Sequence, residues 1–491
     1  MARTKKYAAL DLGAESGRTV IGSFNGNKLS LDVAHRFAND PVKLPNGLHW
    51  NALRQFSEIK AGIGHAVSQA GSDLVSLGID TWGVDFGLLD KQGALLGNPY
   101  HYRDSRTDGM VEKACRKVSR KQIFNATGIQ FMQLNTVFQL FAMAATRSPQ
   151  LEVAKRLLFM PDLFNYWLTG VEGNEYTIAS TSQLLNAKTK SWAKSLARKL
   201  GIPPQIFGPI IPPGAVLGRM LKPVTDEVGG PKVKVVAPGT HDTASAVAAV
   251  PAETDSYVYL SSGTWSLIGV ETPKPVIHAA SLEYNMTNEG GVCDTIRLLK
   301  NITGLWLVQE CRRAWAAKGE TLSYADITRM AQKAKPFYAV ISPDEPSFLK
   351  PGDMPSKIVA YCRKTRQKVP TTKGQIVRLA LESLALKYRW VFEKLEELVD
   401  HRLDVLHIVG GGTQNKLLNQ MAADSVRRPV VTGPIEATAA GNVLMQMLAM
   451  KDIKSLAEGR AVIRRSFQTD VYEPHHADPW DEAYETFCAL S

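Results

Sequence analysis

Residues 6–24 read KYAALDLGAESGRTVIGSF, which predicts two short strands joined by a tight polar turn. A third strand, KLSLDVAHRF at 28–37, continues the meander, and a similar strand, Ser/Gly turn and strand recurs at 257–270 as YVYLSSGTWSLIGV. Ser and Gly dominate ordinary turns, so either hairpin alone says little about function. Their recurrence predicts two related lobes, each opening with a turn whose backbone N–H groups can bind an anion. Two such turns facing each other would hold a polyphosphate.

Composition favours a two-lobed globular protein with small-molecule partners. The chain has 491 residues, of which 44% are hydrophobic and 21% charged. Its net charge of +11 raises the possibility of nucleic-acid binding. The basic residues are scattered, with no aromatic interleaving and no zinc-finger pattern. We therefore expect anionic small molecules, and no nucleic acid, as partners.

Cysteine usage and hydropathy predict a cytoplasmic protein. The five cysteines are dispersed and form no CxxC pair, which predicts free thiols in a reducing compartment. The N-terminal apolar run is broken at Asp11, so we expect no signal peptide. No window approaches the ~18 continuous apolar residues of a membrane span.

The first half of the chain continues with further strands and helices. Residues 74–93, LVSLGIDTWGVDFGLLDKQG, predict a strand, a loop and a strand, and a mostly helical region follows. The Pro- and Gly-rich stretch 201–218 predicts a long surface connection. A boundary near 250–256 would divide the chain into lobes of residues 1–250 and 251–491.

Two patterns characterise the second half. Apolar residues from Val377 to Leu398 alternate spacings of four and three, which predicts one core-facing side of a long helix. Residues 404–424, DVLHIVGGGTQNKLLNQMAAD, predict a strand, a glycine turn and a helix. Such a turn lets a ligand approach the backbone, and the helix N-terminus favours polar or anionic groups.

The stretch APGTHDTASAVAAV at 237–250 places His241 and Asp242 between an apolar strand and a small-residue helix. One interpretation is that Asp242 is a helix N-cap, because its oxygen accepts from free backbone N–H groups. The other is that its carboxylate acts chemically on a ligand. This stretch alone favours capping.

Taken together, the motifs resemble those of the FGGY carbohydrate kinases over residues 7 to 450. The resemblance rests on ALDLGAESGR, GIDTWGVDFGLLD, YRDSRT, MPDLFNYWLTG, THDTASAV, YLSSGTWSLIG, NEGG, LKNITGLWLVQE and LHIVGGGTQN. It implies an α/β, two-lobed, actin- and hexokinase-like (ribonuclease H-like) ATPase fold with a central cleft. It also implies ATP and Mg²⁺ as cofactors, and a monomer or homodimer. TWGVDF, THDTASA and KNITGLWLVQ most resemble the family members that phosphorylate L-rhamnulose, which would give L-rhamnulose 1-phosphate.

The same resemblance assigns roles to individual residues. Asp242 matches the general base, which phosphoryl transfer to an alcohol uses to orient and deprotonate the hydroxyl. Near a helix N-terminus its anion would be favoured by the helix dipole. Asp11, at the end of the first strand, is the expected Mg²⁺ ligand. The expected sugar contacts are Gly83, His241, Asp242, Thr243 and Asn301, and the expected nucleotide contacts are Gly13, Ala14, Glu15, Ser16, Gly17, Thr264, Gln309 and Gly411.

Several neighbouring residues have open roles. Trp82 and Phe131 would cover the methyl end of a 6-deoxy sugar or belong to the core. Asp85 and Asp104 would accept hydroxyl protons, with Arg103 and Arg106 pairing with them. Glu15 puts negative charge into a phosphate turn, which weakens the site unless it points outward or pairs with Arg18.

Two rival functions remain at this stage. A kinase for another ketose, such as fuculose or xylulose, would share the machinery and differ in its pocket. A nucleotide-binding module without sugar chemistry would share the turns, and sugar would not stimulate its use of ATP.

Overall fold

The computed structural model describes residues 3–230, 233–475 and 478–490. They form two compact units. The first comprises residues 1–251, 271–298 and 437–467, and the second comprises residues 252–270, 299–436 and 468–491. The chain thus leaves the first unit next to the expected boundary at residue 250, but returns to it twice. That residues 251–491 act together as one nucleotide-binding lobe stays a prediction.

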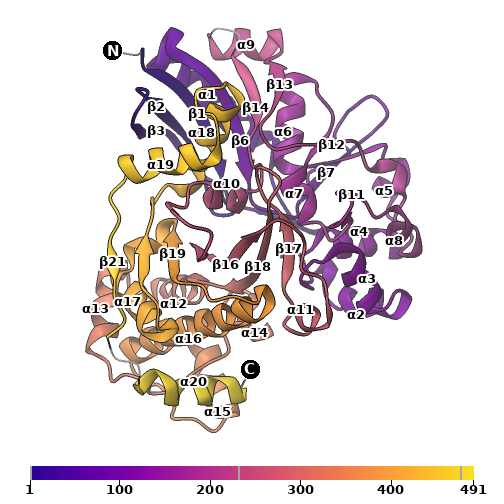
Figure 1. Cartoon of the computed structure of the whole chain (residues 1–491). Coiled ribbons are helices and arrows are strands. Elements are labelled where there is room, and N and C mark those ends of the chain that lie inside the picture. Colours follow the sequence, from indigo (N-terminus) through magenta and orange to yellow (C-terminus); the bar gives the residue numbers. More distant parts are fainter. Residues whose placement is uncertain (1–2, 231–232, 476–477, 491) are drawn as a thin grey trace. The chain divides into compact units, whose positions relative to one another are not determined.

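The predicted N-terminal meander is confirmed and forms half of the first unit's main sheet (Figure 1). The sheet has the order β13-β14-β6-β1-β2-β3, antiparallel from β1 to β3 and parallel from β1 through β6 to β14. Because the carboxyl ends of parallel strands meet at one edge, residues after β1, β6 and β14 lie together. The strands are β1 (Lys5–Leu12), β2 (Ser16–Phe24), β3 (Leu29–Ala38), β6 (Leu74–Thr81), β13 (Ala215–Arg219) and β14 (Lys234–Ala237).

Helices cover both faces of this sheet. On β2, Thr19 faces α1 (Ala52–Ala70), where a Cβ added to Gly62 would touch it, and Gly22 faces Val443 of α18 (Ala437–Ala449). Side chains three positions apart on a strand point to opposite faces, so α1 and α18 lie on opposite sides. Helix α18 also packs on α10 (Asp242–Ala248), which follows β14. In Figure 1, α18 and α19 (Leu456–Ser466), coloured yellow, lie beside the indigo strands, so segments from both ends of the sequence build this unit.

The region predicted to be mostly helical forms a second core in the first unit, with Phe124, Phe138 and Phe159 fully buried. Its elements are β7 (Phe86–Leu89), η2 (Ser105–Thr107), α2 (Met110–Lys117), α3 (Arg120–Thr127), α4 (Thr136–Ala145), α5 (Pro149–Val153), β8 (Arg156–Phe159), α6 (Met160–Thr169), β9 (Asn174–Glu175), α7 (Tyr176–Ser180), β10 (Leu185–Asn186), β11 (Ser191–Trp192) and α8 (Lys194–Lys199). The remaining elements of the unit are β4 (Val42–Leu44), β5 (Gly47–His49), η1 (Gly71–Asp73), η3 (Pro204–Ile206), β12 (Ile210–Ile211), α9 (Lys222–Val228), α11 (Ala279–Glu283), β17 (Thr287–Gly290) and α19 (Leu456–Ser466).

The prediction that residues 201–218 form a surface connection is wrong. Ile206 and Phe207 are buried, β12 pairs in parallel with β9, and β13 adds an edge strand to the main sheet. The prolines in this stretch mark turns, and the apolar residues between them pack and pair.

The second unit contains β15, β19, β20, β21 and most of β16 and β18, which belong to a sheet with the order β17-β18-β16-β15-β19-β20-β21. The predicted hairpin at 257–270, the glycine turn after residue 409 and the long helix are confirmed as β15–β16, η4 and α16. The residues that share the apolar side of α16 are buried, from Val377 to Leu398. The elements are β15 (Tyr257–Ser262), β16 (Trp265–Thr272), β18 (Ile296–Thr303), α12 (Trp306–Ala316), α13 (Tyr324–Lys333), α14 (Pro346–Leu349), α15 (Met354–Lys364), α16 (Lys373–Val399), β19 (Val405–Val409), η4 (Gly411–Gln414), α17 (Lys416–Val426), β20 (Val430–Thr432), β21 (Val471–Tyr472) and α20 (Asp478–Leu490).

None of the described helices is both long and apolar enough to cross a membrane.

The contact between α10 and α18 gives a test of the fold. A Cβ added to Gly441 would lie 1.7 Å from the backbone oxygen of Ser245, which a rotamer change cannot relieve. We therefore expect Gly441→Ala to cost at least about 2 kcal/mol of stability, as overpacking does. Gly64→Ala in α1 is the matched control, because its Cβ would only touch the Val228 carbonyl at an ordinary 3.7 Å. Thermal denaturation should show a lower melting temperature for Gly441→Ala than for Gly64→Ala. Equal melting temperatures would contradict the close packing of α10 on α18.

Candidate active site

The turn between β14 and α10 is held by a buried carboxylate. Glu175 is fully buried, and its Oε2 accepts from the backbone N and hydroxyl of Thr240 at 3.2 and 2.6 Å. The same oxygen accepts from the Thr177 hydroxyl at 2.6 Å, and the Thr177 hydroxyl oxygen accepts from His241 N at 3.2 Å. Thr81 N at the end of β6 donates to the Thr240 carbonyl at 2.9 Å. These bonds fix the backbone on which Asp242 follows.

Asp242 is the first residue of α10, whereas the N-cap position belongs to His241. The N-cap interpretation of Asp242 is therefore wrong. Its Oδ1 accepts from the backbone N of Thr243 at 2.6 Å and from the Thr243 hydroxyl at 3.1 Å. The side chain keeps 28% of its surface exposed. The Asp242 carboxylate is therefore fixed by hydrogen bonds and still accessible to a ligand.

Burial raises the pKa of Asp242, and the nearby Asp11 charge adds to the rise. The charge of His241 and the hydrogen bonds from Thr243 lower the pKa of Asp242, but they do not cancel the rise that burial causes. The dipole of α10 alone would lower the pKa of Asp242, because it favours the anion. An aspartate with a raised pKa holds a proton more strongly than an ordinary one, which suits a general base.

Asp80 was not singled out from the sequence, although it belongs to this cluster. It is the β6 partner of Asp11 in the parallel register of β1 and β6. Its Oδ2 accepts from Asn442 Nδ2 at 2.5 Å, while its buried Oδ1 has no hydrogen-bond partner among the described residues. Burial raises its pKa well above the usual range, and the charges of Asp11 and Asp242 add to this. An aspartate ending a strand parallel to the Asp11 strand was the signal that could have revealed it.

The Mg²⁺ prediction for Asp11 has mixed geometric support. Asp11 Oδ2 accepts two hydrogen bonds from Arg18, from Nε at 2.9 Å and Nη2 at 2.8 Å. Among the described ranges, no group of three or more His, Cys, Asp or Glu side chains is placed to hold a metal. Mg²⁺ needs only one or two carboxylates when it keeps its waters, and the orphaned Asp80 oxygen beside Asp11 fits that pattern.

The first predicted phosphate turn lies between β1 and β2. Gly13 N donates to the Ser16 carbonyl at 3.0 Å, and Asn39 Nδ2 donates to the Gly13 carbonyl at 2.8 Å. Glu15 and Ser16 are exposed, and Ala14 is partly exposed. Gly17 has a structural role as well, because a Cβ there would collide with the Phe37 ring at 2.1 Å. Glu15 thus lies at the surface, and the Arg18 guanidinium bonds Asp11.

The remaining predicted nucleotide residues lie in the second unit. The hairpin turn at Thr264 is tied to α12, since Trp306 N donates to the Thr264 carbonyl at 3.1 Å. On α12, Gln309 has a buried Oε1 with no hydrogen-bond partner among the described residues. A Cβ added to Gly411 would meet nothing within 4 Å, whereas one added to Gly412 would lie 2.0 Å from Ser262 Oγ. The fold therefore requires glycine at 412 and leaves 411 open.

The predicted sugar residues are divided between the units. In the first, Gly83 lies beside His241, since a Cβ added there would be 3.3 Å from His241 Nε2. Asp242 and Thr243 follow directly in the chain. Asn301 lies on β18 in the second unit and is partly buried.

Asp85 and Trp82 are bound within the protein. Asp85 Oδ2 accepts from Trp50 Nε1, Trp82 Nε1 and Tyr102 N, at 2.6, 3.0 and 3.1 Å. Its Oδ1 accepts from Gln139 Nε2 at 2.9 Å. Burial raises the pKa of Asp85 to about 6, although these hydrogen bonds act to lower it. With its oxygens occupied by protein donors, Asp85 anchors the loop after Gly83.

Asp104 and Phe131 also have structural partners. Asp104 is the N-cap of η2, accepting from Arg106 N, and its other oxygen accepts from Leu48 N. Phe131 belongs to the helical core, with the Arg120 guanidinium 4.0 Å from its ring centroid. Arg103 lies over Tyr102.

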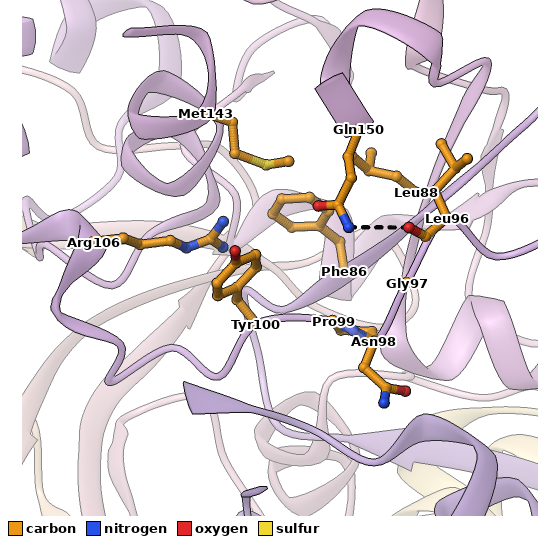
Figure 2. A pocket seen from close by; sticks show the side chains of 10 residues that line it. All are labelled: Phe86, Leu88, Leu96, Gly97, Asn98, Pro99, Tyr100, Arg106, Met143 and Gln150. Carbon is orange, nitrogen blue, oxygen red and sulfur yellow. Dashed lines mark hydrogen bonds between the residues drawn. The ribbon is translucent and has the colours of Figure 1, made fainter. Parts of the chain in front are cut away.

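Arg106 reaches Asp85 only indirectly, because its Nη2 donates to Gln139 Oε1 at 2.7 Å. Its guanidinium lies 3.8 Å from the centroid of the Tyr100 ring, and its buried Nε and Nη1 have no hydrogen-bond partner among the described residues. Figure 2 shows it at one side of a pocket, opposite Gln150 and Leu96. Burial lowers the pKa of Arg106 to about 10.

Comparison with known proteins identifies the family to which the chain belongs. The models for the N-terminal and C-terminal domains of the FGGY family of carbohydrate kinases match residues 6–249 and 258–450. The rhamnulokinase of Bacteroides thetaiotaomicron is 44% identical over 483 residues, which cover 98% of this chain and 99% of that protein. The rhamnulokinase of Bacillus subtilis is 40% identical over 472 residues, 96% of each chain.

Solved sugar kinases share the fold at low identity. The xylulose kinase from Lactobacillus acidophilus has a TM-score of 0.83 at 16% identity, covering 99% of this chain and 97% of that one. The Plasmodium falciparum glycerol kinase with ADP has a TM-score of 0.79 at 15% identity, covering 100% and 98%. These likenesses confirm the predicted actin-like α/β kinase fold. With both domain models matched, the chain belongs to the FGGY family of carbohydrate kinases.

Proposed function

We propose that this chain transfers the terminal phosphoryl group of ATP to O1 of L-rhamnulose, giving ADP and L-rhamnulose 1-phosphate in L-rhamnose catabolism. The observation that carries the proposal is the near full-length identity to rhamnulokinases, 44% over 98% of the chain for the Bacteroides protein. The anchored and partly exposed carboxylate of Asp242 supplies the chemical group that such a transfer requires.

In the proposed reaction Asp242 accepts the proton of the O1 hydroxyl. The bond from O1 to the terminal phosphorus forms as the bond from that phosphorus to the departing ADP oxygen breaks. A positioned general base contributes roughly 10² to 10⁴ in rate. The raised pKa of Asp242 supports this role, because it increases the carboxylate's affinity for the incoming proton.

We assign sugar binding to Gly83, His241, Thr243 and Asn301. The proximity of Gly83 to the His241 ring supports the first two, because a side chain at 83 would fill the space in front of Nε2. The nucleotide contacts proposed are Gly13, Ala14, Glu15, Ser16, Gly17, Thr264, Gln309 and Gly411. The orphaned Gln309 oxygen and the open space at Gly411 support the last two.

Asp11 and its neighbour Asp80 are the residues that would hold a hydrated Mg²⁺. The ion would neutralise phosphate charge during transfer. Asp80 Oδ1 would accept a hydrogen bond from one of its waters.

Cytoplasmic location and a monomeric or homodimeric state complete the proposal. The first is supported by five free and dispersed cysteines, as expected in a reducing compartment.

Substrate preference can be tested directly. ATP consumption with L-rhamnulose, fuculose and xylulose should show the highest kcat/KM for L-rhamnulose, by at least ~10-fold, because a site built around one ketose leaves polar groups unpaired with another. A higher value for another ketose would favour that sugar as the substrate. ATP use that no sugar stimulates would favour a nucleotide-binding module.

Gly411 tests the nucleotide assignment. Gly411→Val should raise KM for ATP at least ~10-fold, because its side chain enters space that the fold leaves open. KM for L-rhamnulose and the melting temperature should stay unchanged, and Gly411→Ala should have a smaller effect. Gly412→Ala is the contrasting control, since its Cβ collides with Ser262 and should lower the melting temperature. An unchanged KM for ATP in Gly411→Val would refute the assignment.

A further inference from the structure

A fully buried arginine holds the ring of His241. Arg297 in β18 has its Nη2 3.0 Å from His241 Nδ1. Its Nε donates to the Gly290 carbonyl at 2.9 Å, and its Nη2 lies 3.2 Å from Glu289 Oε2. A guanidinium that is charge-paired and bonded to the backbone keeps one orientation. The His241 ring is thus tied to β17 and β18.

The chemistry of the guanidinium decides which ring nitrogen carries the proton. A guanidinium is always a donor and has no acceptor atom. At 3.0 Å, His241 Nδ1 therefore has to be the acceptor and cannot carry a hydrogen. The contact from Nδ1 to Glu289 Oε2 is longer, at 3.4 Å. The neutral ring then carries its proton on Nε2.

The protonated nitrogen points to the predicted sugar site. Nε2 lies 3.4 Å from Asp242 Oδ1, longer than a good hydrogen bond, and it borders the space beside Gly83. A ligand oxygen that enters this space can accept a hydrogen bond from Nε2.

We propose that Arg297 is a positioning residue that fixes His241 as an Nε2–H donor to the sugar. The inference rests on the proposed function only for the identity of the ligand. In this arrangement His241 donates to a sugar oxygen, and Asp242 is the adjacent acceptor for the O1 proton. If Nδ1 carried the proton instead, Nε2 would be a second acceptor beside Asp242 and would compete for the hydroxyl hydrogen.

The tautomer can be measured without any substrate. Long-range ¹H–¹⁵N NMR on the full-length protein with ¹⁵N-labelled histidine distinguishes a protonated from a bare ring nitrogen, and His241→Gln assigns the signal. We expect His241 to show a bare Nδ1 and a protonated Nε2. A protonated Nδ1 in the unmodified protein would overturn the proposal, whichever sugar the enzyme phosphorylates.

Substitution of Arg297 tests its control of the ring. In Arg297→Met, Glu289 remains the partner of Nδ1, so we expect the proton to move to Nδ1 and KM for L-rhamnulose to rise about 10-fold, the effect of one hydrogen bond. KM for ATP should not change. Arg297→Lys keeps a charged donor and should restore the Nε2–H signature and part of the affinity.

Two further variants separate this effect from loss of folding. Arg297→Met with Glu289→Gln removes the buried charge pair together and keeps the test available if the single variant unfolds. Arg460→Met breaks a partly buried ion pair of the same unit, with Glu271, and should leave the His241 signature unchanged. An Nε2–H ring in folded Arg297→Met, which keeps Glu289 as the acceptor for Nδ1, would show that the arginine does not set the tautomer, and so would an unchanged KM for L-rhamnulose in the folded double variant.

Discussion

The hydrogen bonds to Glu175 are the constraint on which the site depends. The carboxylate accepts from the backbone N of Thr177, Ile178 and Thr240 and from the hydroxyls of both threonines. Burial raises its pKa, and these bonds act against that rise. Because Thr240 directly precedes His241 and Asp242, one buried group sets the backbone from which both side chains project. Without it, the turn after β14 would keep the bond from β6 and the bond from His241 N to the Thr177 hydroxyl, but would lose both bonds that hold Thr240.

The main sheet then explains why acidic residues gather here. Strands β1, β6 and β14 run parallel, so Asp11, Asp80 and the turn before Asp242 lie at one edge. Their mutual repulsion and burial raise the pKa of Asp80 and Asp242. Burying several carboxylates together is unfavourable for the stability of the fold, and carboxylates with such raised pKa values gather at functional sites.

The strands, the glycine turn and the long helix could be predicted from the sequence, because period-two and heptad-like patterns and turn residues carry local information. The resemblance placed Gly83, His241 and Asp242 in one site, and in the structure they lie together. Glu175 and Arg297 could not be found in this way, because their roles arise from long-range packing. Asp80 ends a predicted strand, but its place beside Asp11 depends on the register of β1 and β6. The prediction from composition was wrong for residues 201–218, where Ile206 is buried and the half-buried Ile210 and Ile211 pair with β9. The sequence likewise suggested that Asp85 could bind a ligand, whereas in the structure its oxygens accept from four protein donors.

The role of Asp242 as the base is most directly tested by turnover of Asp242→Asn with ATP and L-rhamnulose. The amide keeps the shape of the side chain and cannot accept the proton. With ATP affinity and melting temperature retained, kcat should fall at least ~100-fold. A kcat within a few-fold of the unmodified protein, in a folded variant that binds ATP, would contradict the account.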